Sequence, residues 1–181
     1  MIIKNRNEIL IKSAEIISND GMEGYSMQIL ADSLGIRKAS LYHHYKSKEE
    51  IIEAMHDYYH GLLLKRGYRI ELSSDAQNVI SELVGHWSAL FFSDEMYDYL
   101  RSLLTLRQND ERAYEEWRSI ALTIEGQSRI IIEKFTKRGD IISPLFSAYL
   151  ELSLERALIT GESTELDGLT TSFSALLSHG F

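Results

Sequence analysis

The side chains best suited to chemistry lie between positions 26 and 48, and they suit contacts to DNA. Arg37 and Lys38 can contact a phosphate or a guanine edge, and Tyr42 and His43 can donate hydrogen bonds to phosphates. Ser40 is small enough to allow a close approach. The candidate DNA contacts are Ser26, Arg37, Lys38, Ser40, Tyr42, His43, His44 and Lys48.

The spacing around these residues predicts two short helices joined by a tight turn. Ser26 is a good N-cap for the first helix, because its hydroxyl can accept from free amides of the first turn. The apolar face of that helix is Met27, Leu30, Ala31 and Leu34. Gly35 can adopt the left-handed conformation in which helices often end, and residues 37–44 form the second helix. Ser47 and Glu50 form a capping box that starts a longer helix. This arrangement fits a helix-turn-helix, whose second helix lies in the major groove.

Apolar residues recur at helical spacing along the rest of the chain, so we expect an all-α protein of about nine helices. We expect a loop at 68–74 and place Pro144 in the first turn of its helix, where proline is tolerated. We assign residues 1–46 to a helix-turn-helix DNA-binding domain and residues 47–181 to a ligand-binding and dimerisation domain. The expected helices are 5–19, 26–34, 37–44, 47–67, 75–93, 93–106, 111–137, 144–160 and 164–178.

The charge is distributed unevenly along the 181 residues, whose net charge is −8. Residues 1–70 hold ten Lys and Arg against nine Asp and Glu, a net of +1, whereas residues 71–181 hold nine against eighteen, a net of −9. The acidity therefore belongs to the second part, and the first part can still face DNA. There is no cysteine, no convincing signal peptide and no membrane-length apolar run. We expect a soluble, cytoplasmic protein that does not enter a membrane.

The segment around the turn resembles the tetracycline-repressor (TetR) family of bacterial transcriptional regulators. The resemblance spans about residues 9–52 and rests on Ala31, Gly35-Ile36, Lys38 to Tyr42, His43-His44-Tyr45 and Ser47 to Glu50. Arg37 departs from the family, which often has a capping Ser or Thr at this position. The resemblance implies a homodimeric repressor that binds double-stranded DNA at a near-palindromic operator and is released by a small-molecule effector. It also implies that the helix from Ser47 joins the DNA-binding end to the regulatory body.

The effector site implied by the resemblance lies between the helices of residues 75–160. His86 and Arg107 would be the polar anchors of an anionic ligand. Aromatic and leucine stripes are more often solid core, so a packed body without a cavity stays open as an alternative. The candidate ligand contacts are His86, Trp87, Leu90, Phe91, Leu103, Arg107, Trp117 and Tyr149.

The two C-terminal helices are apolar on more than one side, which favours a self-complementary two-fold interface. In the resembled family these two helices pair with their copies as a four-helix bundle. The alternative is that they only close the core of the monomer. The candidate interface residues are Leu152, Leu166, Leu169, Phe173 and Leu176.

Catalytic motifs are absent from the sequence, so we do not expect an enzyme or a cofactor. There is no glycine-rich phosphate loop, no G-x-S-x-G elbow and no H-E-x-x-H motif. Glu53, His56 and His60 share a helical face and could hold a metal, although a solvated polar stripe is the simpler reading, and we assign no metal site. An all-α metalloenzyme and a regulator controlled by a protein partner remain the alternatives.

Overall fold

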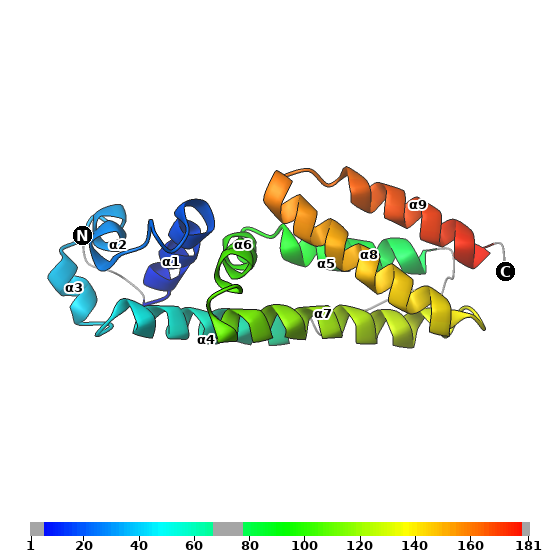
Figure 1. Ribbon diagram of the computed structural model, residues 1–181, viewed down its shortest axis with the longest axis horizontal. Coiled ribbons are helices and arrows are strands. Elements are labelled where there is room, and N and C mark those ends of the chain that lie inside the picture. Colours follow the sequence, from blue (N-terminus) through cyan, green and yellow to red (C-terminus); the bar gives the residue numbers. More distant parts are fainter. Residues whose placement is uncertain (1–5, 67–77, 179–181) are drawn as a thin grey trace. The chain divides into compact units, whose positions relative to one another are not determined.

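The computed structural model describes residues 6–66 and 78–178, and within these ranges the chain forms nine α-helices and no strand (Figure 1). The prediction of an all-α protein of about nine helices is confirmed. None of the helices in these ranges is both long enough and apolar enough to span a membrane. The helices are α1 (Arg6–Asp20), α2 (Met27–Ser33), α3 (Lys38–Tyr42), α4 (Lys48–Arg66), α5 (Val79–Phe91), α6 (Tyr97–Leu106), α7 (Glu111–Ile132), α8 (Gly139–Thr160) and α9 (Thr164–Ser178).

The chain divides into two compact units, each made of two stretches of sequence. The first unit comprises Met1–Lys65 and Asp94–Trp117, and the second comprises Arg66–Ser93 and Arg118–Phe181. This division reflects packing. The predicted division at residue 46, into a DNA-binding and a ligand-binding domain, concerns function and stays a prediction.

The first unit is built on the packing of α1 against α2 and α6. Ile9 and Ile17 of α1 have no exposed surface, and Ser18 donates a hydrogen bond of 3.0 Å to Asp98 near the start of α6. The hydroxyl of Ser13 donates to the Ile9 carbonyl at 2.7 Å, so the Tyr25 hydroxyl at 2.9 Å must be the donor to Ser13. Burial raises the pKa of Tyr25 to about 12, which keeps this donor protonated.

The second unit packs α9 against α5 and α8. Its core holds the largest buried side chains of these helices, including Trp87, Phe91 and Phe146. Trp87 and Phe91 meet edge to face with ring centroids 6.2 Å apart, and Phe146 meets Phe173 in the same way at 5.2 Å. Aromatic pairs prefer this offset geometry, so the rings of the core specify how α8 and α9 meet.

Three predicted helix ends are confirmed by the backbone. Gly21, Gly35 and Gly161 all have positive φ, at 69°, 65° and 77°. At Gly35 the turn closes as helix C-termini often do, because the amide of Ile36 donates to the Ala31 carbonyl and that of Gly35 to the Asp32 carbonyl. The predicted start of the fifth helix at Asp75 and the loop at 68–74 lie outside the described residues.

The boundary between α7 and α8 differs from the prediction. α7 ends at Ile132 rather than near Lys137, and α8 begins at Gly139. A Cβ at Gly139 would lie 2.7 Å from Cγ and 2.8 Å from Cα of Glu133, so only glycine allows this close turn. Pro144 is therefore inside α8, at its sixth residue, and the prediction of a first-turn proline is wrong.

An internal proline removes one helical hydrogen bond, that of its missing amide to the carbonyl of Asp140. Asp140 is exposed, so water can replace the lost donor. Just before the proline, the Ser143 hydroxyl donates to the carbonyl of Gly139, the first residue of α8, at 2.6 Å and so supports the first turn. These two features explain why the helix extends on the N-terminal side of its proline.

Candidate nucleic-acid interface

The second helix of the predicted helix-turn-helix is α3, which is only five residues long. Its single buried residue is Leu41, which has no exposed surface and anchors the helix on the first unit. Arg37 is the N-cap residue and makes no side-chain capping bond, although the Ser40 amide donates to its carbonyl at 2.8 Å. The guanidinium of Arg37 is therefore not used to cap the helix.

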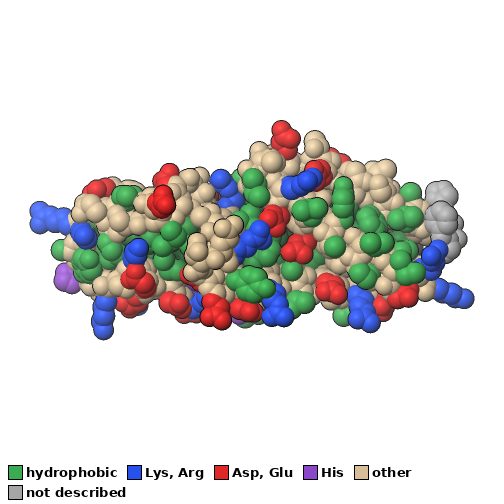
Figure 2. Space-filling model, in the orientation of Figure 1, with side chains coloured by type: hydrophobic (Ala, Val, Ile, Leu, Met, Phe, Trp, Pro, Cys, Tyr) green, Lys and Arg blue, Asp and Glu red, His purple; other side chains and the backbone are tan. Residues whose placement is uncertain are grey.

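The outward face of α3 carries cationic and aromatic side chains. Arg37, Lys38 and His43 are exposed, and Tyr42 keeps 48% of its surface exposed although it is a large aromatic residue. Lys and Arg side chains (blue) and a His (purple) project from this end of the first unit in Figure 2, where Figure 1 places α3. Arg37 and Lys38 form no ion pair within the described part of the chain, so their charges are available to phosphates.

The other predicted DNA contacts are less exposed. Ser40, His44 and Lys48 are half-buried. Ser26 is also half-buried, and its hydroxyl accepts from the Ile29 amide at 3.2 Å, so it caps α2 as the sequence predicts. Accepting this bond leaves the O–H of the hydroxyl as a donor, so the predicted contact of Ser26 to DNA stays a prediction.

The third helix of the predicted motif, α4, starts with the predicted capping box in a modified form. The Glu50 amide donates to the Ser47 hydroxyl at 3.2 Å. The Glu50 carboxylate accepts from the amide of Lys46, one residue earlier than in the standard box. The pair fixes the turn that connects α3 to α4.

α4 is joined to the later part of the first unit by four polar contacts. Nδ1 of His56 lies 3.0 Å from the Tyr99 hydroxyl of α6, and Nδ1 of His60 lies 2.9 Å from a carboxylate oxygen of Glu116 in α7. Arg112 pairs with both Glu53 and Asp57. The helix that follows the helix-turn-helix is thus held from α6 and α7.

These contacts also bear on the metal hypothesis. The reading of Glu53, His56 and His60 as a solvated polar stripe is wrong for His56, which is fully buried. Each of the two histidines has its own partner, and no group of three potential ligands comes together among the described residues. Sequence reasoning missed the pairing of His56 with Tyr99, which only the packing of α4 on α6 creates.

The eight predicted ligand contacts belong to different units. Leu103, Arg107 and Trp117 lie in the first unit, and the others lie in the second. Trp87, Leu90 and Phe91 are buried core residues, whereas Tyr149 is exposed. In the first unit the Arg107 guanidinium lies 5.2 Å from the centroid of the Trp117 ring. In the second unit His86 and Leu90 line a depression of about 210 Å³.

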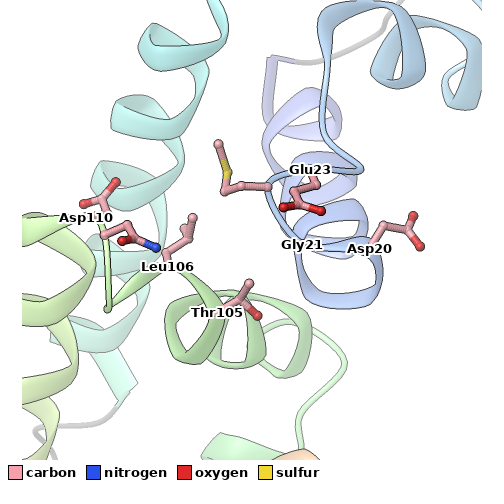
Figure 3. Close-up of a pocket in the computed structure, with 8 residues that line it drawn as sticks. Asp20, Gly21, Glu23, Thr105, Leu106 and Asp110 are labelled. Atoms are coloured by element: carbon pink, nitrogen blue, oxygen red, sulfur yellow. The ribbon is translucent and has the colours of Figure 1, made fainter.

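A cavity of the first unit contains none of these eight residues. It measures about 520 Å³ and lies between the α1–α2 turn and the α6–α7 turn. Figure 3 shows Glu23 on one side and Asp110 on the other, while the Asp20 side chain points away from Leu106. One Asp110 oxygen already accepts from the Ala113 amide at 3.0 Å and so caps α7.

The predicted interface residues fall into two groups. Leu166 and Leu169 are buried in the core of the second unit, so they have little surface left for a partner. Leu152 and Leu176 keep 45% and 38% of their surface exposed, and Phe173 is half-buried. Further large apolar residues of α8 are exposed that the sequence did not indicate as interface residues: Ile141, Leu145, Tyr149 and Ile159.

Comparison with known proteins agrees with the geometry of the first unit. The family model for "Bacterial regulatory proteins, tetR family" matches residues 9–55, from α1 into α4. Over 87 residues the chain is 32% identical to the HTH-type transcriptional repressor KstR2 of Mycolicibacterium smegmatis, a match that covers 48% of this chain and 41% of that protein. The chain thus spans less than half the length of the curated relatives that it matches.

Solved structures share the fold over nearly the whole chain. A transcriptional regulator from Rhodococcus sp. Rha1 has a TM-score of 0.70 and 14% identity, with 97% of each chain covered. The TetR family transcriptional regulator PfmR from Thermus thermophilus has a TM-score of 0.68 and 22% identity, with 99% of this chain and 98% of that one covered. The family model over the helix-turn-helix and the curated repressors confirm the resemblance of this segment to the TetR family of bacterial regulatory proteins, and the solved structures share the fold of the chain.

Proposed function

We propose that this protein is a sequence-specific DNA-binding transcriptional regulator, and specifically a repressor that acts as a homodimer. The observation that carries the proposal is the exposed face of α3, where Arg37, Lys38 and Tyr42 flank the single buried residue of the helix, Leu41. A short helix that follows the turn of a helix-turn-helix and carries exposed cations suits the major groove of DNA. The family model covers the same residues.

Dimerisation is supported by the unpartnered surface of α8. Apolar side chains at 141, 145, 149, 152 and 159 recur at helical spacing and are each 45% exposed or more. A groove of about 460 Å³ lies beside them, between α8 and α9, and apolar side chains (green) gather over these helices in Figure 2. Such a surface is costly to leave in water, and a second copy related by a two-fold axis would cover it.

The DNA-binding proposal is tested by fluorescence anisotropy with two labelled duplexes across a salt series. One duplex carries the sequence immediately upstream of the coding region, and the other carries the same bases scrambled. We expect tighter binding to the first duplex, weakening as salt rises because bound cations release counterions from the DNA. If the protein binds both duplexes equally weakly, selection from random-sequence DNA tests whether it prefers any other sequence. Failure to enrich any sequence would contradict the proposal.

Matched variants locate the interface. Tyr42→Ala and Lys38→Ala should each weaken binding about fivefold or more, because each removes a hydrogen-bond donor or a charge at the groove. Tyr114→Ala and Lys134→Ala remove an exposed tyrosine and an exposed lysine elsewhere. These controls should leave the affinity unchanged, so an equal loss in both pairs would reject α3 as the interface.

Control by a small molecule is the finer part of the proposal. It rests on the likeness to the TetR family and on candidate contacts in each unit, His86 and Trp87 in the second and Arg107 and Trp117 in the first. The test is release of the labelled duplex by compounds from a metabolite library, followed by binding of the active compound to Trp87→Phe and Arg107→Gln variants. If no metabolite releases the duplex but a second protein from the same cells does, the partner-controlled alternative would be favoured.

A further inference from the structure

The segment that follows α3 is held by a residue from the beginning of the first unit. Nη2 of Arg6, the first residue of α1, donates to the carbonyl of His44 at 3.2 Å. The same guanidinium lies 4.6 Å from the centroid of the Tyr45 ring. Two contacts of different kinds, a charged hydrogen bond and a cation–π contact, thus converge on residues 44–45.

α3 needs such support because its own hydrogen bonds are few. The helix has five residues, and the amides of His44 and Tyr45 both donate to the one carbonyl of Leu41, each at 2.9 Å. The last carbonyls of a helix have no partner within it, and the carbonyl of His44 points to Arg6 instead. A cation at the C-terminal end also suits the partial negative charge there.

Both ends of this bridge are fixed in the first unit. Tyr45 is 3% exposed, so its ring cannot follow a moving guanidinium. Arg6 lies in the same part of α1 as Ile9 and Leu10, which are buried and fix the first turns of the helix in the core. The bridge therefore links the first residue of α1 to the segment that follows α3.

We propose that Arg6 is a positioning residue for DNA recognition, which sets the orientation of α3 through residues 44–45 and is not itself a phosphate contact. This proposal rests on the DNA-binding function proposed above. The sequence alone allows the opposite role, since an arginine near the N-terminus can equally reach the DNA backbone.

Arg6→Ala and Arg6→Lys separate the two roles in the anisotropy assay. A positioning role predicts that both variants lose about three- to tenfold in the ratio of affinities for specific and scrambled duplex, with the salt dependence unchanged. Lysine cannot replace Arg6 in this role, because it lacks the planar guanidinium that both donates to the His44 carbonyl and lies against the Tyr45 ring. A phosphate contact predicts instead that Arg6→Ala weakens both duplexes alike and lowers the slope of log affinity against log salt by about 0.9, while Arg6→Lys is nearly normal. That second pattern would overturn the proposal.

Lys12→Ala is the matched control, since it removes one positive charge from the same helix at a residue that pairs with Glu15. It should leave the affinity ratio unchanged. Amide hydrogen exchange of the free protein gives a readout that does not depend on DNA. We expect exchange at residues 42–46 to speed up in Arg6→Ala and not in Lys12→Ala. Unchanged exchange would reject the bridge even if the protein proves not to bind DNA, whereas faster exchange without selective DNA binding by the wild type would reject only the proposed function.

Discussion

The imidazole of His56 and the phenol of Tyr99 lie 3.0 Å apart, from Nδ1 to the hydroxyl oxygen, although 43 residues separate them in the sequence. Both side chains have no exposed surface. Tyr99 is also stacked on Tyr59, with centroids 4.2 Å apart and planes 4° from parallel. Nε2 of His56 has no hydrogen-bond partner among the described residues, so the Nε2–H of a protonated imidazolium would be buried without an acceptor.

His56 should make the stability of the protein pH-dependent. Burial lowers the pKa of His56 below its usual 6.5, and nearby Asp110, Glu116 and Arg112 act more weakly. The unfolded chain then takes up a proton that the folded chain resists, so this contribution is full above pH 6.5 and is lost as pH falls below it. Urea unfolding of wild type and His56→Gln between pH 8 and 5 should show a smaller decline in the variant. His60→Gln, at a half-exposed histidine of the same helix, is the control, and equal declines for wild type and His56→Gln would contradict the prediction.

Leu41 should be essential for α3 to pack. Leu41→Ala removes a fully buried side chain and should destabilise the first unit by about 2–5 kcal/mol. Ile29→Ala removes a side chain of the same class that is 44% exposed, and should cost less than about 1 kcal/mol. Thermal unfolding followed by circular dichroism compares the two. A similar loss for both would mean that α3 does not depend on Leu41.

Two glycines should respond to alanine with opposite signs. Gly35 has φ of 65°, a conformation that costs alanine about 1–2 kcal/mol. Gly85 lies within α5, and a Cβ added there meets no atom within 4 Å. Gly85→Ala should therefore stabilise the protein by about 0.5–1 kcal/mol. Chemical denaturation of both variants checks the signs, and a stabilising Gly35→Ala would contradict the left-handed turn.

The exposed face of α8 should carry the dimer. Leu145→Glu and Leu152→Glu each place a charge on this face, where Leu145 is 61% and Leu152 45% exposed. Burying an unpaired charge in an interface is costly, so the dissociation constant of the dimer should rise at least about tenfold. Leu122→Glu on α7, at a leucine that is 54% exposed, should not change it. Sedimentation velocity over a range of concentrations is the measurement, and a dimer as strong with both glutamates as without would place the interface elsewhere.

The sequence by itself determined the local structure of the helix-turn-helix. The N-cap at Ser26 and the box of Ser47 with Glu50 join residues at most four positions apart, and the left-handed conformation of Gly35 belongs to a single residue. Interactions of this range depend on residue type and spacing, so they can be read before any fold is known. The burial of Leu41 and the exposure of Tyr42 also follow from helical spacing once α3 is recognised.

Only the tertiary structure decided the contacts between distant parts of the chain. The bridges from Arg6 to residues 44–45 and from His56 to Tyr99 span 38 and 43 residues. Nothing in the local pattern distinguishes a buried histidine from one on a solvated stripe. The start of α8 was decided in the same way, because it depends on the close approach of Gly139 to Glu133. The polarity of a side chain and its place in the helical pattern limit what it can contact. The packing of helices that are far apart in the sequence selects its actual partner.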